Sequence, residues 1–127
     1  MKYIVDSQKS VDQATEAFQQ SAARNQYGVL HIHDLTETLR EKGHPIDREC
    51  RILEVCNPQQ AVRVLGVDMT MNMALPCRVS VYEDEGTTRI GMIRPAAMLG
   101  MLSDSEDLRN VATQVEADLI RMIDEAK

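Results

Sequence analysis

The sequence has few aromatic residues and no tryptophan, since one Phe and three Tyr make up 3% of its 127 residues. It also lacks an excess of positive charge, because 20 acidic residues outnumber 14 basic ones and give a formal net charge of −6. Proteins that bind nucleic acids usually present basic patches and aromatic stacking platforms. Composition therefore argues against a nucleic-acid partner, and the negative charge argues against binding to an anionic membrane surface.

Long hydrophobic runs are also absent. No segment approaches the roughly 20 apolar residues that a membrane span needs. The N-terminal segment Met1–Asp6 is too short and too polar for a signal peptide. We therefore expect no membrane partner and a cytoplasmic location. The length, with 43% hydrophobic and 27% charged residues, predicts a single domain over residues 1–127.

Cysteine is scarce, with an odd count of three. The odd count and the reducing compartment that we expect both argue against a framework of structural disulfides. Two of the cysteines stand next to prolines, in Cys56-Asn57-Pro58 and in Pro76-Cys77. Proline restricts the backbone, so both thiols should hold defined positions. If the strands that carry them are neighbours, the two sulfurs could form a disulfide, a metal site or a reactive thiol pair.

The pattern of hydrophobic residues predicts alternating strands and helices. The expected elements are a strand at 2–5, a helix ending near 25, a strand at 27–35, a short helix at 36–42, a strand at 50–56, a helix at 58–66, a hairpin of 78–83 with 88–93, and a long C-terminal helix. This β-α-β(n)-α order predicts an α+β domain, in which an antiparallel sheet packs against the long C-terminal helix.

Several local signals support these elements. Ser10 with Gln13, and Ser103 with Glu106, have the spacing of helix capping boxes. Asn57 is a good N-cap residue, and the proline after it suits a first helical position. The C-terminal helix carries one apolar stripe, formed by Leu108, Val111, Ala112, Val115, Leu119, Met122 and Ile123.

Five segments share a further pattern: Tyr27–Leu30, Thr38–Gly43, Ile52–Pro58, Leu75–Glu83 and Pro95–Gly100. In order and spacing the chain resembles, over nearly all of its length, the bacterial and archaeal family called Domain of Unknown Function 302. The resemblance implies a fold like one repeat of the TATA-binding protein and a small homodimer. The family has no assigned activity, so the resemblance carries over no catalytic residue and no cofactor.

The resemblance includes the positions of Cys56 and Cys77 but leaves out Cys50, which we interpret as incidental. It also shows one departure at Arg94, where relatives tend to place an acidic residue before the proline equivalent to Pro95. Any site that uses this carboxylate in relatives is therefore in doubt here.

The two proline-flanked cysteines are the main candidates for a functional site. Cys56 precedes a predicted helix N-terminus, whose free N–H groups and dipole can lower a thiol pKa. The alternative is a small buried hydrophobic residue, the usual environment of free cysteine. Cys77 should share the inward strand face of Val79 and Val81, where burial raises a thiol pKa. We predict a ligand-binding site at Cys56, Asn57, Pro58, Pro76 and Cys77.

Three methionines precede this second cysteine, at Met69, Met71 and Met73. In an extended segment their alternation would place all three sulfurs on one side, as a Cu(I) site requires. The same alternation also suits core packing, which is the commoner use of methionine.

Two histidines form a weaker candidate for a metal site. His31 and His33 lie two residues apart on a predicted strand and should share a face with Tyr27 and Val29. Together with Asp34 they could bind zinc. The alternative is that both histidines face solvent or an interface.

The apolar run Ala96–Leu102 has no polar positions and needs cover, either as a dimer contact or as the wall of a ligand cavity. The leading hypothesis is a small, homodimeric cytoplasmic domain that binds a small ligand or a metal near Cys56 and Cys77. The first alternative is a thiol-based redox or sulfur-carrier protein, with Cys56 as nucleophile and Cys77 as resolving thiol. The second is a structural module whose cysteines only pack, and whether the protein is an enzyme stays open.

Overall fold

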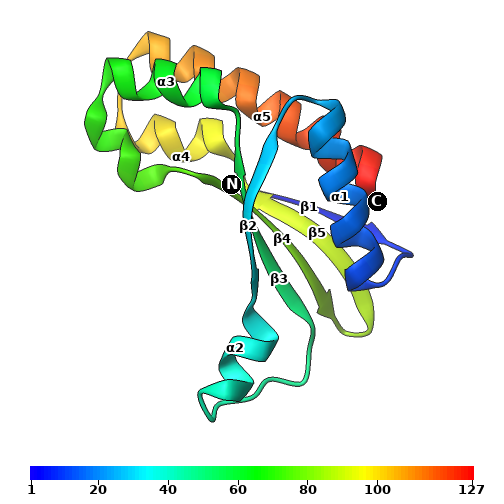
Figure 1. The fold of residues 1–127 in the computed structure, drawn as a ribbon. Helices are drawn as coiled ribbons and strands as arrows, with labels where there is room; N and C mark the ends of the chain where they lie inside the picture. Colours follow the sequence, from blue (N-terminus) through cyan, green and yellow to red (C-terminus); the bar gives the residue numbers. More distant parts are fainter.

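Five antiparallel strands form one sheet in the order β1-β5-β4-β3-β2, in a computed structural model that describes residues 1–127 (Figure 1). The strands are β1 (Lys2–Ser7), β2 (Gly28–Asp34), β3 (Cys50–Cys56), β4 (Cys77–Asp84) and β5 (Thr87–Ile93). The helices are α1 (Val11–Arg24), α2 (Leu35–Glu41), α3 (Pro58–Val67), the 3₁₀ helix η1 (Met69–Ala74), α4 (Pro95–Leu102) and α5 (Glu106–Ala126). This architecture confirms the predicted α+β class with a long C-terminal helix.

The helices cover only one face of the sheet. α1 and α5 pack against each other on this face, while α3 and α4 contact the first half of α5 beyond one end of the strands (Figure 1). α2 projects at the opposite end, beside β2 and β3. The other face of the sheet has no helix over it and is called the open face below.

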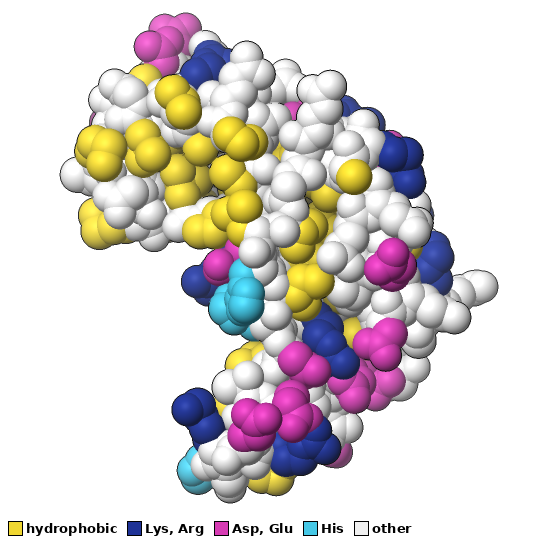
Figure 2. Space-filling model, in the orientation of Figure 1, with side chains coloured by type: hydrophobic (Ala, Val, Ile, Leu, Met, Phe, Trp, Pro, Cys, Tyr) yellow, Lys and Arg dark blue, Asp and Glu magenta, His cyan; other side chains and the backbone are white.

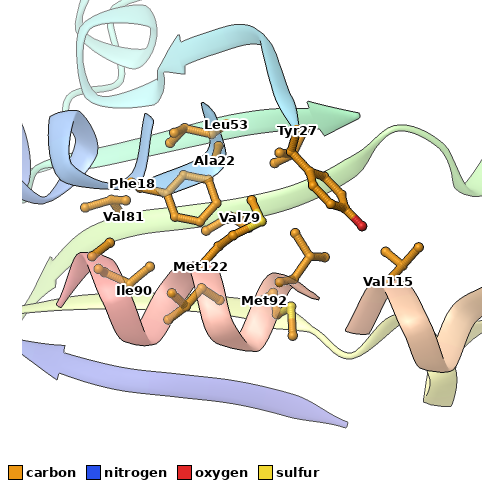
Figure 3. Packing of buried hydrophobic residues seen from close by; sticks show 14 of the residues in the cluster. Phe18, Ala22, Tyr27, Leu53, Val79, Val81, Ile90, Met92, Val115 and Met122 are labelled. Carbon is orange, nitrogen blue, oxygen red and sulfur yellow. The ribbon is translucent and has the colours of Figure 1, made fainter. Parts of the chain in front are cut away.

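The core lies between the covered face and the helices (Figure 3). Alternate residues of the strands point into it, and Phe18 of α1 packs among them with no exposed surface. Fully buried residues of the strands and α5 include Leu53, Val79, Val81, Ile90, Leu119, Met122 and Ile123. Because side chains alternate, the residues between these strand positions belong to the open face.

Local signals in the sequence fix several of these elements. Ser10 Oγ accepts from the Gln13 N–H at 3.1 Å, and Gln13 Oε1 accepts from the Ser10 N–H at 3.0 Å, so the predicted capping box is confirmed. Asn57 caps α3 by accepting from the Gln60 N–H at 3.2 Å. The turn between β4 and β5 has positive φ at Glu85 and Gly86, 52° and 78°, as a type I′ hairpin turn requires.

The predicted capping box at the start of α5 is wrong. Ser105 is the N-cap and accepts from the Leu108 N–H at 3.4 Å, whereas the Ser103 hydroxyl accepts from the Ser105 N–H at 3.1 Å. The apolar run before it forms α4, with Pro95 in its first turn.

A β-bulge overturns the predicted facing of the histidines. Val29 pairs with Val55, but His31 pairs with Glu54, so Leu30 is an extra residue without a partner. The insertion moves His31 and the later residues of β2 by one position, and side chains change face at every position. Both histidines therefore lie opposite to Val29, on the open face beside Glu54.

The predicted alignment of the three methionine sulfurs is also wrong. Residues 69–74 form the 3₁₀ helix η1 and not an extended segment. With three residues per turn, alternate side chains of such a helix point in different directions. Met71 is only 5% exposed, whereas Met69 and Met73 are 64% and 81% exposed. The three sulfurs therefore do not converge on one copper site.

None of the helices combines the length and the apolar character that would let it span a bilayer.

Candidate ligand-binding site

A cavity of about 260 Å³ lies where α3 and α5 meet the ends of β3 and β4. Of its 16 lining residues, 12 are hydrophobic. The lining comprises Tyr27, Val55, Cys56, Asn57, Gln60, Ala61, Val64, Leu65, Leu75, Pro76, Cys77, Pro95, Leu99, Val111, Ala112 and Val115. Ligand-binding pockets are typically concave and mostly apolar with a few polar groups, and this cavity has that character.

The sequence builds this cavity by turning the chain sharply at the end of β3. Asn57 ends the strand, and Pro58 begins α3 in the next position, so the helix leaves the sheet at once. The side of α3 that faces the cavity carries a small side chain, because Ala61 lies on it one turn before Val64. The space between α3 and α5 is therefore left partly open.

Four of the five residues in the predicted ligand-binding set line this one cavity: Cys56, Asn57, Pro76 and Cys77. The fifth, Pro58, is exposed at the start of α3 and does not line it. The peptide bond between Leu75 and Pro76 is cis.

The predicted cysteine pair is not formed. Cys50, Cys56 and Cys77 are all free thiols. Cys77 pairs in register with Val55, the residue before Cys56, so strand alternation starts the two thiol side chains on opposite faces of the sheet. The two cysteines contribute to the wall of the same cavity without bonding to each other.

Cys77 is held as a neutral thiol. Burial raises its pKa to about 11, and the charge of the Cys56 thiolate adds a smaller upward shift of that pKa. The predicted inward facing of Cys77 with Val79 and Val81 is confirmed, because all three pack against the core. Burial also raises the pKa of the Cys50 thiol. Cys50 does not line this cavity, and it belongs to no group of side chains that could hold a metal ion.

The predicted zinc site is not formed either. No group of three or more His, Cys, Asp or Glu side chains comes together in a way that could hold a metal ion. The rings of His31 and His33 meet edge to face with centroids 4.3 Å apart, and His33 Nε2 lies 3.2 Å from Glu54 Oε2. The histidines therefore interact with each other and with one carboxylate on the open face.

A buried polar cluster beside the cavity was not found from the sequence. The Tyr27 hydroxyl donates to Asp118 Oδ2 at 2.8 Å, and both residues are less than 10% exposed. Gln114 and Arg121 donate to the other oxygen of Asp118 at 3.0 Å and 2.9 Å. Burial, with the hydrogen bond to Asp118, raises the pKa of Tyr27. The available signal was an acidic residue inside the apolar stripe of α5, since a buried carboxylate requires partners.

The chain matches the family described as "Domain of unknown function DUF302" over residues 3–126. It belongs to this family. The resemblance noted in the sequence is thereby confirmed.

This DUF302 domain is similar to a solved structure described as an uncharacterized conserved DUF302 protein from Bacillus stearothermophilus. The two are 36% identical in sequence and superpose with a TM-score of 0.94. The match covers 99% of this chain and 98% of the other. No match was found among curated proteins.

The departure at Arg94 has a structural counterpart in this DUF302 domain. The guanidinium carbon of Arg94 lies 5.6 Å from the centroid of the Tyr3 ring, within the range of a cation–π contact. The Tyr3 hydroxyl in turn donates to Asp124 at 2.6 Å. Arg94 thus connects the start of α4 to β1, and it does not line the cavity.

Proposed function

We propose that this DUF302 domain binds a small, largely apolar molecule in the cavity between α3 and α5, beside Cys56 and Cys77. The observation that carries the proposal is the lining, in which hydrophobic residues from two helices and two strand ends surround a few polar groups. The volume of about 260 Å³ lies just below the usual range of roughly 300–1,000 Å³ for ligand pockets. This favours a compact ligand.

The polar groups of the wall support binding more than thiol chemistry. Asn57 is occupied in capping α3, and Cys77 has a pKa raised to about 11. Redox cycling requires a thiolate and a second thiol close enough to bridge. Because all three cysteines are free and Cys77 holds its proton, a redox or sulfur-carrier role is the less favoured alternative.

The composition supports a small-molecule partner in the cytoplasm. The net charge of −6 does not provide the basic surface that nucleic-acid binding needs. Three unpaired thiols fit a reducing compartment.

Filling the cavity tests the proposal. Ala61→Phe places a ring into the space between α3 and α5, and Ala117→Phe makes the same exchange on the exposed side of α5, away from the cavity. Binding would be titrated with the neutral apolar dye N-phenyl-1-naphthylamine, and folding checked by circular dichroism. We expect Ala61→Phe to weaken binding about tenfold or more, equivalent to about 1.4 kcal/mol, and Ala117→Phe to leave it unchanged. Equal affinity of all three proteins would overturn the proposal.

We also propose that the domain is a homodimer through an exposed surface on η1 and α4. Met69, Met73, Met101 and Leu102 are 64%, 81%, 75% and 56% exposed, and hydrophobic side chains gather over this region (Figure 2). Contiguous apolar surface of this kind favours an interface. Light scattering after size exclusion should give a dimer for the native chain and a monomer for Met101→Glu with Leu102→Glu. A monomeric native protein at about 100 µM, far above the Kd of a stable dimer, would contradict this.

A further inference from the structure

A second and larger cavity, of about 550 Å³, lies on the open face at the same end of the sheet. Of its 17 lining residues, 11 are hydrophobic, and the only charged ones are Lys2 and Arg78. The chain has 20 acidic residues, yet none of them lines this cavity. In a protein with a net charge of −6, the cavity is a local concentration of positive charge.

The two cations have no partner within the protein. Neither Lys2 nor Arg78 takes part in an ion pair or a side-chain hydrogen bond. Glu54 lies opposite Arg78 in the register of β3 and β4, but its carboxylate is engaged by His33 Nε2 at 3.2 Å. Arg78 therefore forms no ion pair with the acidic residue closest to it in the sheet.

Elsewhere on the open face, charges are matched. Arg89 lies 3.3 Å from Asp6 and 3.3 Å from Asp84, and Asp84 also contacts Arg48 at 2.9 Å. This set occupies the end of the sheet near the β4–β5 turn. Unpaired cations on the sheet are thus confined to the cavity end.

The remaining wall combines hydrogen-bond donors with apolar surface. Ser80 and Tyr82 line the cavity, and their hydroxyls form no hydrogen bond within the protein. Ile4 and Ile93 are 44% and 55% exposed, and Met98 closes one side from α4. A molecule here would meet donors at one part of its surface and hydrocarbon at the rest.

We propose that this cavity binds an amphipathic organic anion, with its acid group at Lys2 and Arg78 and its apolar body along Ile4, Ile93 and Met98. A guanidinium pairs well with the planar oxygens of a carboxylate, and the ammonium adds charge without strict geometry. The site is distinct from the cavity between α3 and α5, although residues 75–77 and Pro95 form part of the wall of both.

A second copy of the chain does not suit the charged part of this cavity around Lys2 and Arg78, although Met73 of the proposed dimer surface lies at its edge. A two-fold contact brings the same patch of both copies together, so it must be self-complementary. Here it would set cations against cations with no acidic residue in the cavity to match them. A free anion is the occupant that the charges favour.

Calorimetric titration with decanoate and with the neutral decanamide tests the proposal. We expect the double variant Lys2→Gln with Arg78→Gln to weaken decanoate binding about tenfold or more, and to leave decanamide within about twofold. The control Arg40→Gln with Lys42→Gln removes the same charge from exposed positions at the far end, on α2 and its C-cap, and should leave decanoate within about twofold.

Each other outcome decides against the proposal. Absence of decanoate binding, an equal loss in the control variant, or conversion of a dimer to a monomer by the double variant would overturn it. Ala61→Phe should leave decanoate affinity within about twofold, so failure of the first proposed site would not be confused with failure of this one.

Discussion

The two ends of the sheet differ in the side chains that they carry: charged groups gather at one end and hydrophobic groups at the other (Figure 2). At the end near α2 and the β4–β5 turn, here called the ion-paired end, Arg51 lies within ion-pair distance of Asp12, Asp34 and Glu49. At the opposite end, here called the hollow end, α3, η1 and α4 surround two cavities lined mostly by apolar residues.

This difference supports the proposed location of the two binding sites at the hollow end. Unfilled space reduces the stability of a fold, because the groups around it lose packing contacts. The ion-paired end shows that the chain can pair its charged side chains. The lack of ion pairs at the hollow end is therefore a local property of that region. We infer that the ion-paired end serves the fold, whereas the hollow end gives up stability for ligand binding.

The largest expected effect comes from breaking the polar cluster that supports the hollow end. Asp118→Ala leaves the buried Tyr27 hydroxyl and the Gln114 amide without their acceptor. We expect the free energy of unfolding to fall by about 3 kcal/mol, because a buried unpaired donor such as the Tyr27 hydroxyl costs about 1–3 kcal/mol, whereas the exposed Gln114 amide can bond to water. Urea unfolding followed by circular dichroism measures it.

The matched control is Asp118→Asn, which keeps an acceptor for Tyr27 and should lose only about half as much. An equal loss in both variants would mean that the carboxylate charge matters, and not the acceptor.

Next in size is an alkaline loss of stability that depends on Cys77. Its pKa rises from 9.0 in the unfolded chain to about 11 in the fold, so between these values the folded protein holds a proton that the unfolded chain has lost. The stabilisation is complete below pH 9 and disappears as the pH rises through 11. Its upper limit is about 2–3 kcal/mol.

Unfolding free energies measured from pH 8 to 11 should therefore fall more steeply for the native protein than for Cys77→Val. The valine variant keeps the hydrophobic contact and retains Tyr27, whose raised pKa contributes above pH 10 in both proteins. Parallel curves for the two proteins would show that Cys77 titrates as an exposed thiol.

Much of the fold could be predicted because its signals are local. The cap at Ser10, the Asn57-Pro58 helix start and the inward alternation from Cys77 each depend on a few neighbouring residues. The same local logic identified four of the residues around the first cavity, since they flank the two strand ends. In these places, short-range propensity and tertiary packing agree.

The failures have two physical causes. The bulge at Leu30 depends on how β2 pairs with β3, and one inserted residue reverses every later side chain. In η1, a local signal was overlooked, because Asp68 caps the 3₁₀ helix by accepting from the Thr70 N–H at 2.9 Å. The wall from α5 and the buried Asp118 could not be placed, since they meet Tyr27 and α3 only through long-range packing.

The smallest expected effect tests the ion-paired end. The Arg48 side chain is 58% exposed and contacts Asp84, itself 34% exposed, at 2.9 Å. Exposed pairs contribute about 0–1 kcal/mol and are screened by salt. Arg48→Gln should therefore lower the free energy of unfolding by about 0.5 kcal/mol in dilute buffer, and by less in roughly 0.5 M NaCl.

Arg51→Gln provides the contrast, because the Arg51 side chain is only 14% exposed among its three carboxylates. Its removal should lower stability more than that of Arg48 and should keep a larger part of the effect in salt, because partly buried pairs are screened less. If the two variants lost equally little, the charges at this end would be solvated surface groups. The ion-paired end would then contribute little to the stability of the fold, and it would not offset the stability lost at the two cavities.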